Sequence, residues 1–118
     1  MTHIKAAGKK LILDFDNFLK MIKPEILQQA KKVSIVGYLA SKGKLPVSQD
    51  AEEILYLSPL REDKDPSFYV NHRGNVFKDF VWDEHRGDAI KLVMLLEKCK
   101  LPVAVKILLD FTGYPLPD

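Results

Sequence analysis

Residues 58–80 read SPLREDKDPSFYVNHRGNVFKDF and contain two short runs of aromatic and β-branched residues. These runs, residues 68–70 and 76–80, have the composition of β-strands. The residues between them, NHRGN, are typical of a tight turn, because Gly74 can take a positive φ and asparagine tolerates one. The segment therefore predicts an antiparallel hairpin, preceded by a long charged loop that Pro59 and Pro66 bound.

The two strands of this hairpin are expected to have one buried face and one exposed face. Successive side chains of a strand point to opposite faces, so Phe68 and Tyr69 lie on different faces, whereas Lys78 and Phe80 share one. We expect Phe68 and Phe80 to belong to the core. For Tyr69 and Trp82, burial and exposure agree equally well with the pattern.

Upstream of the hairpin, the sequence predicts helices and one more strand. Pro24 suits the first turn of a helix, and Ser34 is a candidate N-cap for another. Gly43 is expected to end that second helix in a left-handed conformation. The predicted segments are residues 15–22, 24–32 and 34–42 for helices and residues 54–57 for the strand.

Downstream of the hairpin, helical patterns return. Asp88 is a natural N-cap for residues 89–99, which are apolar on nearly every side. Pro102 begins a last helix, which Gly113 closes. Helices on both sides of a small antiparallel meander predict an α+β fold.

The composition limits the class of protein. The chain has 118 residues, 47% of them hydrophobic, which suits one domain with a core of its own. Its single cysteine, Cys99, excludes an internal disulfide framework and a multi-cysteine zinc site. The longest apolar run is far shorter than the roughly 20 residues that span a bilayer, and the first residues lack the pattern of a secretory signal. We therefore expect a soluble cytoplasmic protein with no membrane partner.

The net charge of +2 conceals an asymmetry along the chain. Residues 1–50 carry nine lysines and four acidic residues, a net of +5, whereas residues 58–91 carry six basic and seven acidic residues, a net of −1. Such lysines are most simply a solvated helical surface, and a phosphate-binding surface is the second interpretation. If the protein binds DNA, we expect the N-terminal helices to contribute much of the electrostatic attraction.

Two blocks of residues keep an order and spacing that indicate a known type of domain. They are Pro59, Lys64, Pro66, Ser67, Phe68 and Val70, followed by Phe77, Phe80, Gly87, Asp88, Ile90 and Val93. With these blocks the chain resembles the N-terminal zinc-ribbon domain of bacterial DnaG-type DNA primases. The resemblance implies a small antiparallel zinc-ribbon-like sheet flanked by N-terminal and C-terminal helices. It also implies an N-terminal extension over residues 1–13, a single domain over residues 14–113 and a tail over residues 114–118.

The metal-ligand positions depart from the family pattern. The Cys, His, Cys and Cys of the family fall here on Ser58, Arg61, Asp79 and Trp82. An arginine stays protonated, a tryptophan offers only a donor, and a serine hydroxyl is a poor zinc ligand. We therefore expect neither zinc nor another cofactor. We expect Trp82 to fill the vacated space with apolar volume, and Arg61 and Asp79 to form an ion pair where zinc would bring them together.

The resemblance implies a role in DNA recognition. Primase zinc-ribbon domains help to recognise single-stranded template DNA beside a separate catalytic domain of the Toprim type. The first hypothesis is therefore a non-catalytic, zinc-free domain that recognises single-stranded DNA in replication or mobile-element machinery, with a separate primase catalytic protein or a helicase as its partner. The alternative is a protein–protein interaction module that no longer binds DNA. The sequence contains no Toprim domain, so catalysis is left open and we expect none from this chain alone.

Aromatic and cationic side chains near the predicted sheet are the candidates for contact with DNA. Single strands bind where exposed aromatics stack on bases and cations meet phosphates. The slightly negative balance of residues 58–91 argues against tight phosphate binding there. The candidates are Arg61, Lys64, Tyr69, Arg73, Lys78, Trp82 and Arg86.

A third hypothesis, an enzyme, rests on Asp14 and Asp16. The segment LILDFDNF is similar to the nucleophile strand of haloacid-dehalogenase-like phosphatases, but such enzymes need a Rossmann-like domain with later Lys and Asp partners. An N-cap role explains the same two aspartates. His72 and His85 fall in predicted loops, where exposed histidines are usually solvated, and they receive no role.

Overall fold

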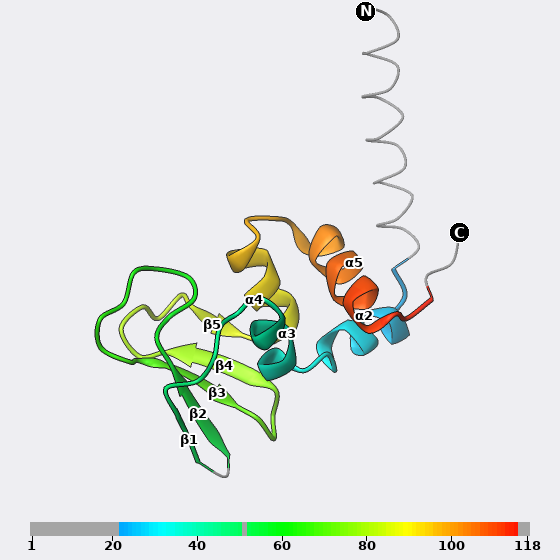
Figure 1. Ribbon diagram of the computed structural model, residues 1–118. Coiled ribbons are helices and arrows are strands. Elements are labelled where there is room, and N and C mark those ends of the chain that lie inside the picture. The colour runs from blue at the N-terminus through cyan, green and yellow to red at the C-terminus, as the bar shows by residue number, and fades with distance from the viewer. Residues whose placement is uncertain (1–21, 51, 116–118) are drawn as a thin grey trace, which may run out of the picture.

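The computed structural model describes residues 22–50 and 52–115 of the chain. Within these residues it has four helices and a five-stranded antiparallel sheet, which confirms the expected α+β class (Figure 1). The helix expected over residues 15–22 lies outside the described residues apart from Ile22, as do Asp14 and Asp16.

The sheet is a meander in which every strand pairs with the next one along the chain, in the order β1-β2-β3-β4-β5. The three central strands agree with the sequence patterns to within about one residue, although the last predicted strand ends at Asp79 and not at Phe80. The two edge strands are too short to carry a pattern of their own and were not expected. The strands are β1 (Ser48–Gln49), β2 (Glu53–Tyr56), β3 (Phe68–Asn71), β4 (Val76–Asp79) and β5 (Arg86–Gly87).

The helices lie on one side of the sheet (Figure 1). Helix α4 packs against β4 and β5, and α2 and α5 pack on α4. Within the described residues, none of these helices combines the length and the apolar character needed to cross a membrane. The helices are α2 (Pro24–Lys31), α3 (Ile35–Ser41), α4 (Ala89–Leu96) and α5 (Leu101–Thr112).

The helix ends follow the expected capping chemistry. The Ser34 hydroxyl accepts a hydrogen bond from the amide of Gly37 at 3.0 Å, and the Asp88 carboxylate accepts one from the amide of Lys91 at 2.9 Å. Gly113 closes α5 with a φ of 75°. These contacts satisfy amides and turn the chain at helix ends, where the helix offers no partner of its own.

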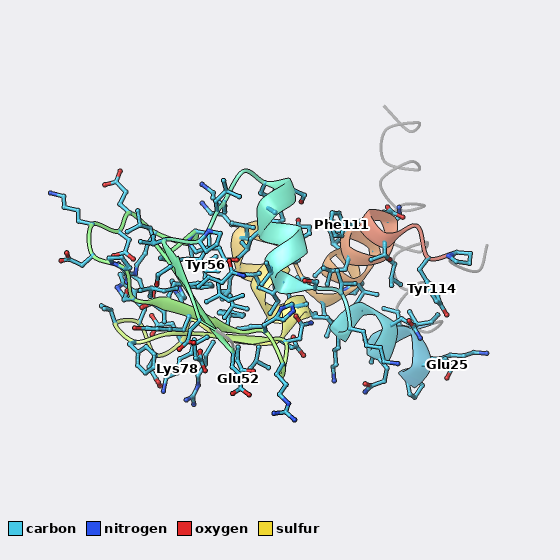
Figure 2. The ribbon with its side chains drawn as sticks, turned by 60° about the horizontal axis from the view of Figure 1, so that its bottom comes forward. Glu25, Glu52, Tyr56, Lys78, Phe111 and Tyr114 are labelled. Atoms are coloured by element: carbon cyan, nitrogen blue, oxygen red, sulfur yellow. The ribbon has the colours of Figure 1, made fainter. Side chains whose placement is uncertain are left out.

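The core lies between the inner face of the sheet and the helices. Phe68 is fully buried at its centre, where its ring stacks on Phe77 with a centroid distance of 5.3 Å and meets Tyr56 edge-on at 6.1 Å. Figure 2 shows Tyr56 on the helix side of the sheet and Lys78 pointing away from the helices. Inner and outer side chains therefore alternate along β3 and β4, as the period of two requires.

The turn between β3 and β4 binds the sheet to the helices through an asparagine. Of the two residue types that the sequence offers for a positive φ in this turn, asparagine takes it: Asn75 has a φ of 53°, and Gly74 does not have a positive φ. Asparagine tolerates the left-handed region better than most residues with a Cβ. The side-chain nitrogen of Asn75 donates to the carbonyl oxygens of Lys31 and Val33, both at 2.8 Å. The side-chain oxygen of Asn75 accepts from the backbone amide of Ile35 at 3.0 Å. The turn is thereby held against the junction of α2 and α3.

Candidate functional site

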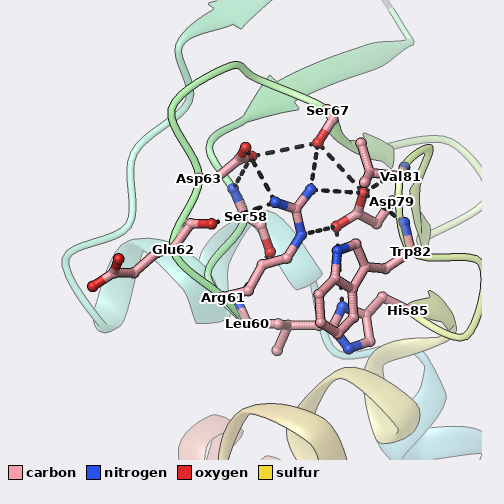
Figure 3. A network of polar contacts seen from close by, with 10 residues as sticks. All are labelled: Ser58, Leu60, Arg61, Glu62, Asp63, Ser67, Asp79, Val81, Trp82 and His85. Atoms are coloured by element: carbon pink, nitrogen blue, oxygen red, sulfur yellow. Dashed lines mark hydrogen bonds and ion pairs between the residues drawn. The ribbon is translucent and has the colours of Figure 1, made fainter.

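The four ligand positions meet in one polar cluster, although none of them carries a family ligand. Ser58 and Arg61 come from the loop after β2, and Asp79 and Trp82 come from the end of β4 and the loop that follows (Figure 3). The topology therefore brings the two loops together as the resemblance implies.

A bidentate ion pair lies at the centre of this cluster. The Nε and Nη2 atoms of Arg61 donate to the two carboxylate oxygens of Asp79 at 3.0 and 3.1 Å. The Asp79 side chain is completely buried, and that of Arg61 is 15% exposed. Charge-assisted, two-pronged hydrogen bonds of this kind are among the stronger polar contacts in proteins. The ion pair expected between these residues is confirmed.

The guanidinium also holds the loop that carries it. Arg61 donates to the Ser67 hydroxyl at 2.8 Å and forms a second ion pair with Asp63 at 3.3 Å. The Asp63 carboxylate in turn accepts from the backbone amide of Ser58 at 2.9 Å, and the Ser58 hydroxyl accepts from the amide of Leu60 at 3.1 Å. The cation thus ties the loop after β2 to the end of β4, which is the connection that zinc makes in a zinc ribbon.

The Asp79 carboxylate is stabilised in its charged form. Burial on its own would raise its pKa, but the hydrogen bond from Arg61 and those from the amides of Val81 and Trp82 outweigh burial and hold the pKa below its usual range. The amide hydrogen bonds measure 2.8 Å from Val81 and 3.3 Å from Trp82. At neutral pH the cluster therefore holds a buried anion with its cation.

Trp82 covers this ion pair and does not fill the space beneath it. Its side chain is 44% exposed, so the expectation that it replaces zinc with buried apolar volume is wrong. The Arg61 guanidinium carbon lies 5.8 Å from the centroid of the indole ring, within the range of cation–π contacts. Polar atoms already occupy the interior of the cluster, which leaves the indole on its surface.

His85 belongs to the same cluster, which the sequence did not reveal. Its side chain is only 12% exposed, with Nδ1 at 4.0 Å from the Asp79 carboxylate. The imidazole stacks on the Trp82 ring at a centroid distance of 5.2 Å. The expectation of an exposed turn histidine is therefore wrong, because the β4–β5 loop folds the ring back onto the cluster.

The residues present at this site do not fit zinc. Arg61 brings a permanent positive charge to a ligand position, and Trp82 brings no electron pair for a metal. Within the part of the chain that the structure describes, no three His, Cys, Asp or Glu side chains are grouped to hold a metal ion. Cys99 lies beyond α4, where its thiol faces the carbonyl oxygen of Val93 at 3.8 Å.

Treatment with a strong chelator is expected to leave the melting temperature unchanged. Structural zinc contributes on the order of 10 kcal/mol to small zinc-binding domains, so its removal from a zinc-dependent fold would unfold it. Thermal melting followed by circular dichroism, with and without EDTA, is the measurement, and elemental analysis of the purified protein is the control. Stoichiometric zinc, or a clear drop in melting temperature with EDTA, would contradict the expectation.

The outer face of the sheet carries a second group of side chains, distinct from the ion-pair cluster. The strand register places Tyr69 opposite Lys78 and Lys78 opposite Arg86, so the three side chains form a row across β3, β4 and β5. Phe80 lies beside this row, with its ring centroid 4.9 Å from that of Tyr69 in an edge-to-face arrangement. We call Tyr69, Lys78, Phe80 and Arg86 the aromatic face.

Phe80 is exposed on this face, and its expected burial is wrong. It is 65% exposed, and the Lys78 ammonium lies 5.1 Å from the centroid of its ring. Side chains two residues apart in a strand lie on the same face, so Phe80 shares a face with the charged Lys78. That shared face was the sequence signal for the exposure of Phe80. An open hollow of about 560 Å³ lies over this face, with Tyr69, Val76 and Phe80 among the residues that line it.

The structure separates the sequence-predicted DNA residues into groups. Tyr69, Lys78 and Arg86 are together on the aromatic face, whereas Arg61 and Trp82 belong to the ion-pair cluster, where the nitrogens of Arg61 are directed at protein acceptors. Lys64 is exposed in the charged loop. Arg73 lies in the β3–β4 turn, paired with Glu52 at 3.3 Å, and Arg86 pairs with Asp83 at 3.6 Å.

This geometry defines a class of domain. Short antiparallel strands form a meander, two loops meet at the four ligand positions, and helices cover one face of the sheet. This is the architecture expected of a primase zinc-ribbon domain. Residues 21–118 match the family described as CHC2 zinc finger, the zinc ribbon of DnaG. The match spans most of the chain, and the chain belongs to that family.

A solved structure supports the same assignment. The chain is similar to the primase of Aquifex aeolicus, in a crystal structure of its zinc-binding and RNA polymerase domains, with 27% sequence identity and a TM-score of 0.65. The similarity covers 81% of this chain and 23% of the Aquifex chain, so this chain spans less than a quarter of that protein. A search of curated proteins finds no match. The family resemblance is thereby confirmed, while the expected domain boundaries at residues 14 and 113 stay predictions.

Proposed function

We propose that this chain is a zinc-independent, non-catalytic primase-type domain that binds single-stranded DNA on the aromatic face. It acts in replication or mobile-element machinery beside a separate primase catalytic protein or a helicase. The observation that carries the proposal is the edge-to-face pair of the exposed Phe80 and the half-buried Tyr69 next to Lys78. The family to which the chain belongs supports the same class of ligand.

The aromatic face has the chemistry that a single strand requires. Bases stack on exposed aromatic rings, at about 1–3 kcal/mol per base, whatever their sequence. The edge-to-face contact holds Tyr69 and Phe80 in one arrangement, so little side-chain entropy is lost on binding. Lys78 and Arg86 stand in the same row and are placed to meet the phosphates of the stacked nucleotides.

The ion-pair cluster supports binding without zinc. It joins the loop after β2 to the end of β4, and Phe80 follows Asp79 directly in the chain. The backbone amide of Phe80 donates to the carbonyl oxygen of Ser67 at 3.0 Å, and the Ser67 hydroxyl accepts from Arg61. Asp79, the residue before Phe80, and Ser67, the residue before β3, thus position the backbone that carries the exposed ring of Phe80.

Removal of either ring is expected to weaken DNA binding about 10-fold or more, because each variant loses one stacking surface. The variants are Tyr69→Ala and Phe80→Ala, and the measurement is fluorescence anisotropy with a labelled oligothymidylate of about ten nucleotides. Phe111→Ala is the matched control, because Phe111 is an aromatic residue, 44% exposed, on α5 away from the sheet (Figure 2). Equal affinities of all three variants and the wild type would contradict the assignment of the aromatic face.

A second candidate function is docking of a protein partner on the same face. Val76 is 43% exposed and lines the same hollow as Phe80, and exposed apolar side chains that are grouped together mark interaction surfaces. The DNA titration separates the two functions. If the wild-type chain does not bind the oligonucleotide even at low salt, single-strand binding is excluded and the protein-docking function takes its place.

A further inference from the structure

A second hollow, of about 490 Å³, lies between the C-terminal end of α2 and the β3–β4 turn. Its lining differs from that of the aromatic face, because it contains no apolar side chain, and Lys, Arg or His side chains supply four of its eight residues. Lys31 and Lys32 contribute from the C-terminal end and C-cap of α2, and His72 and Arg73 contribute from the turn. We call these four residues the basic hollow.

The basic hollow has a fixed framework. The Asn75 side chain bonds both to the end of α2, at Lys31 and Val33, and to the start of α3, at Ile35. A further hydrogen bond of 2.7 Å, from the amide of Gly74 to the Asn71 side chain, closes the turn itself. Two segments that are 40 residues or more apart in sequence are therefore held at a set separation, and their cations converge without a large loss of backbone entropy on binding.

The cations of the hollow are weakly neutralised. Within the described ranges, neither Lys31 nor Lys32 is in an ion pair shorter than 4.0 Å. Arg73 contacts Glu52, but these side chains are 84% and 57% exposed, so the pair contributes little and exchanges readily. An anion that enters the hollow would meet three positive charges and one acidic neighbour.

The basic hollow is continuous with the aromatic face through the hairpin. Asn71 and Val76, at the ends of β3 and β4, line the hollow on the outer face of the sheet. The residues between them, 72–75, line the basic hollow. A DNA strand that lies along the aromatic face therefore reaches Lys31 and Lys32 by passing over the tip of one hairpin.

We propose that the basic hollow binds a phosphate group of the single strand whose bases stack on the aromatic face. The proposal rests on the DNA-binding function proposed above. Phosphate fits this hollow because its negative charge is spread over several oxygens. The ammonium groups of lysines and the guanidinium group of an arginine can therefore bind it from several directions. The binding site for the strand thus extends from the ribbon to the C-terminal end of α2, within the lysine-rich first 50 residues of the sequence.

The test measures the salt dependence of binding in a variant of the hollow. For single strands, the logarithm of affinity falls with the logarithm of salt concentration by about 0.7 for each phosphate contact. We expect Lys31→Gln/Lys32→Gln to lower the magnitude of this slope by about 0.7, the contribution of the one phosphate that the hollow binds, whereas Phe80→Ala lowers affinity and leaves the slope unchanged. Lys100→Gln/Lys106→Gln is the matched control, since it removes the same charge at two exposed positions. Lys100 directly precedes α5, and Lys106 lies within it.

A second probe separates this proposal from the proposed function. Inorganic pyrophosphate, titrated into the isotope-labelled protein, is expected to shift the NMR amide signals of Gly74 and Asn75 in the wild type and not in the double lysine variant. If the oligonucleotide binds but the slope is the same in wild type and variant, the hollow is not a phosphate site, and the aromatic face stands alone. If pyrophosphate shifts these signals while the oligonucleotide does not bind, DNA binding fails and the hollow takes a free phosphate compound. If neither probe binds, both proposals are overturned.

Discussion

Replacement of Asp79 by alanine is expected to lower the free energy of unfolding by about 3–5 kcal/mol, a large part of the stability of an ordinary domain. The variant leaves Arg61 in the cluster with Asp63 as its remaining carboxylate partner. It also removes the acceptor for the amides of Val81 and Trp82. A buried charge without its partner and two amides without an acceptor each cost free energy. Urea denaturation followed by circular dichroism measures the loss.

The double variant Arg61→Met/Asp79→Leu is the control for this interpretation. Replacement of both members of a buried ion pair by apolar side chains is often tolerated, because the desolvation of both charges disappears together. We expect the double variant to regain the part of the stability that the unpaired Arg61 costs in Asp79→Ala, whereas the amides of Val81 and Trp82 lack their acceptor in both variants. If Asp79→Ala unfolds at the same urea concentration as the wild type, the ion pair does not hold the two loops together.

The pH dependence of stability gives an independent measure of the same contact. The pKa of Asp79 is lower in the folded chain than its value of about 3.9 in an unfolded chain. The carboxylate therefore stabilises the fold fully above that unfolded value, and its contribution is lost as the pH falls through the lower, folded value. Asp79→Asn should show a flatter decline in stability than the wild type below about pH 4.

Replacement of Phe68 by alanine is expected to destabilise the chain by about 3–5 kcal/mol. The ring is fully buried, stacked on Phe77 and in edge contact with Tyr56, so its removal leaves a cavity that the neighbouring strands cannot close. Chemical denaturation is again the measurement. The loss should appear as a lower midpoint with an unchanged dependence on denaturant, because the unfolded chain exposes nearly the same surface.

Tyr69→Ala is the matched control for Phe68→Ala, because it removes an aromatic ring from the next residue on the opposite face. Tyr69 is half-buried and packs on the exposed ring of Phe80, so the variant should cost much less stability while it weakens DNA binding. Similar losses of stability from the two variants would mean that the outer face of the sheet is as well packed as the inner one, which would leave no surface for bases.

Local patterns were sufficient for most of the framework. The caps at Ser34 and Asp88 and the central strands depend on a few neighbouring residues, and the structure has them as expected. The short strands β1 and β5 were missed because their pairing depends on the strands beside them and not on their own composition. Only the tertiary structure decides that Asn75 and not Gly74 takes the positive φ, since the helix junction supplies the partners that hold Asn75 in the left-handed conformation.

The family can be recognised from the order of the residues. The spacing of the family's metal ligands then assigns their positions to Ser58, Arg61, Asp79 and Trp82. The ion pair of Arg61 with Asp79 follows as well, since opposite charges at two positions that must meet will attract. The full set of residues at the former zinc position is decided by the tertiary structure, because Asp63, Ser67 and His85 join the cluster where the two loops meet. The exposure of Phe80 and the meeting of Lys31 with Arg73 are also decided in three dimensions, because burial and charge convergence depend on which segments pack together and not on the residues alone.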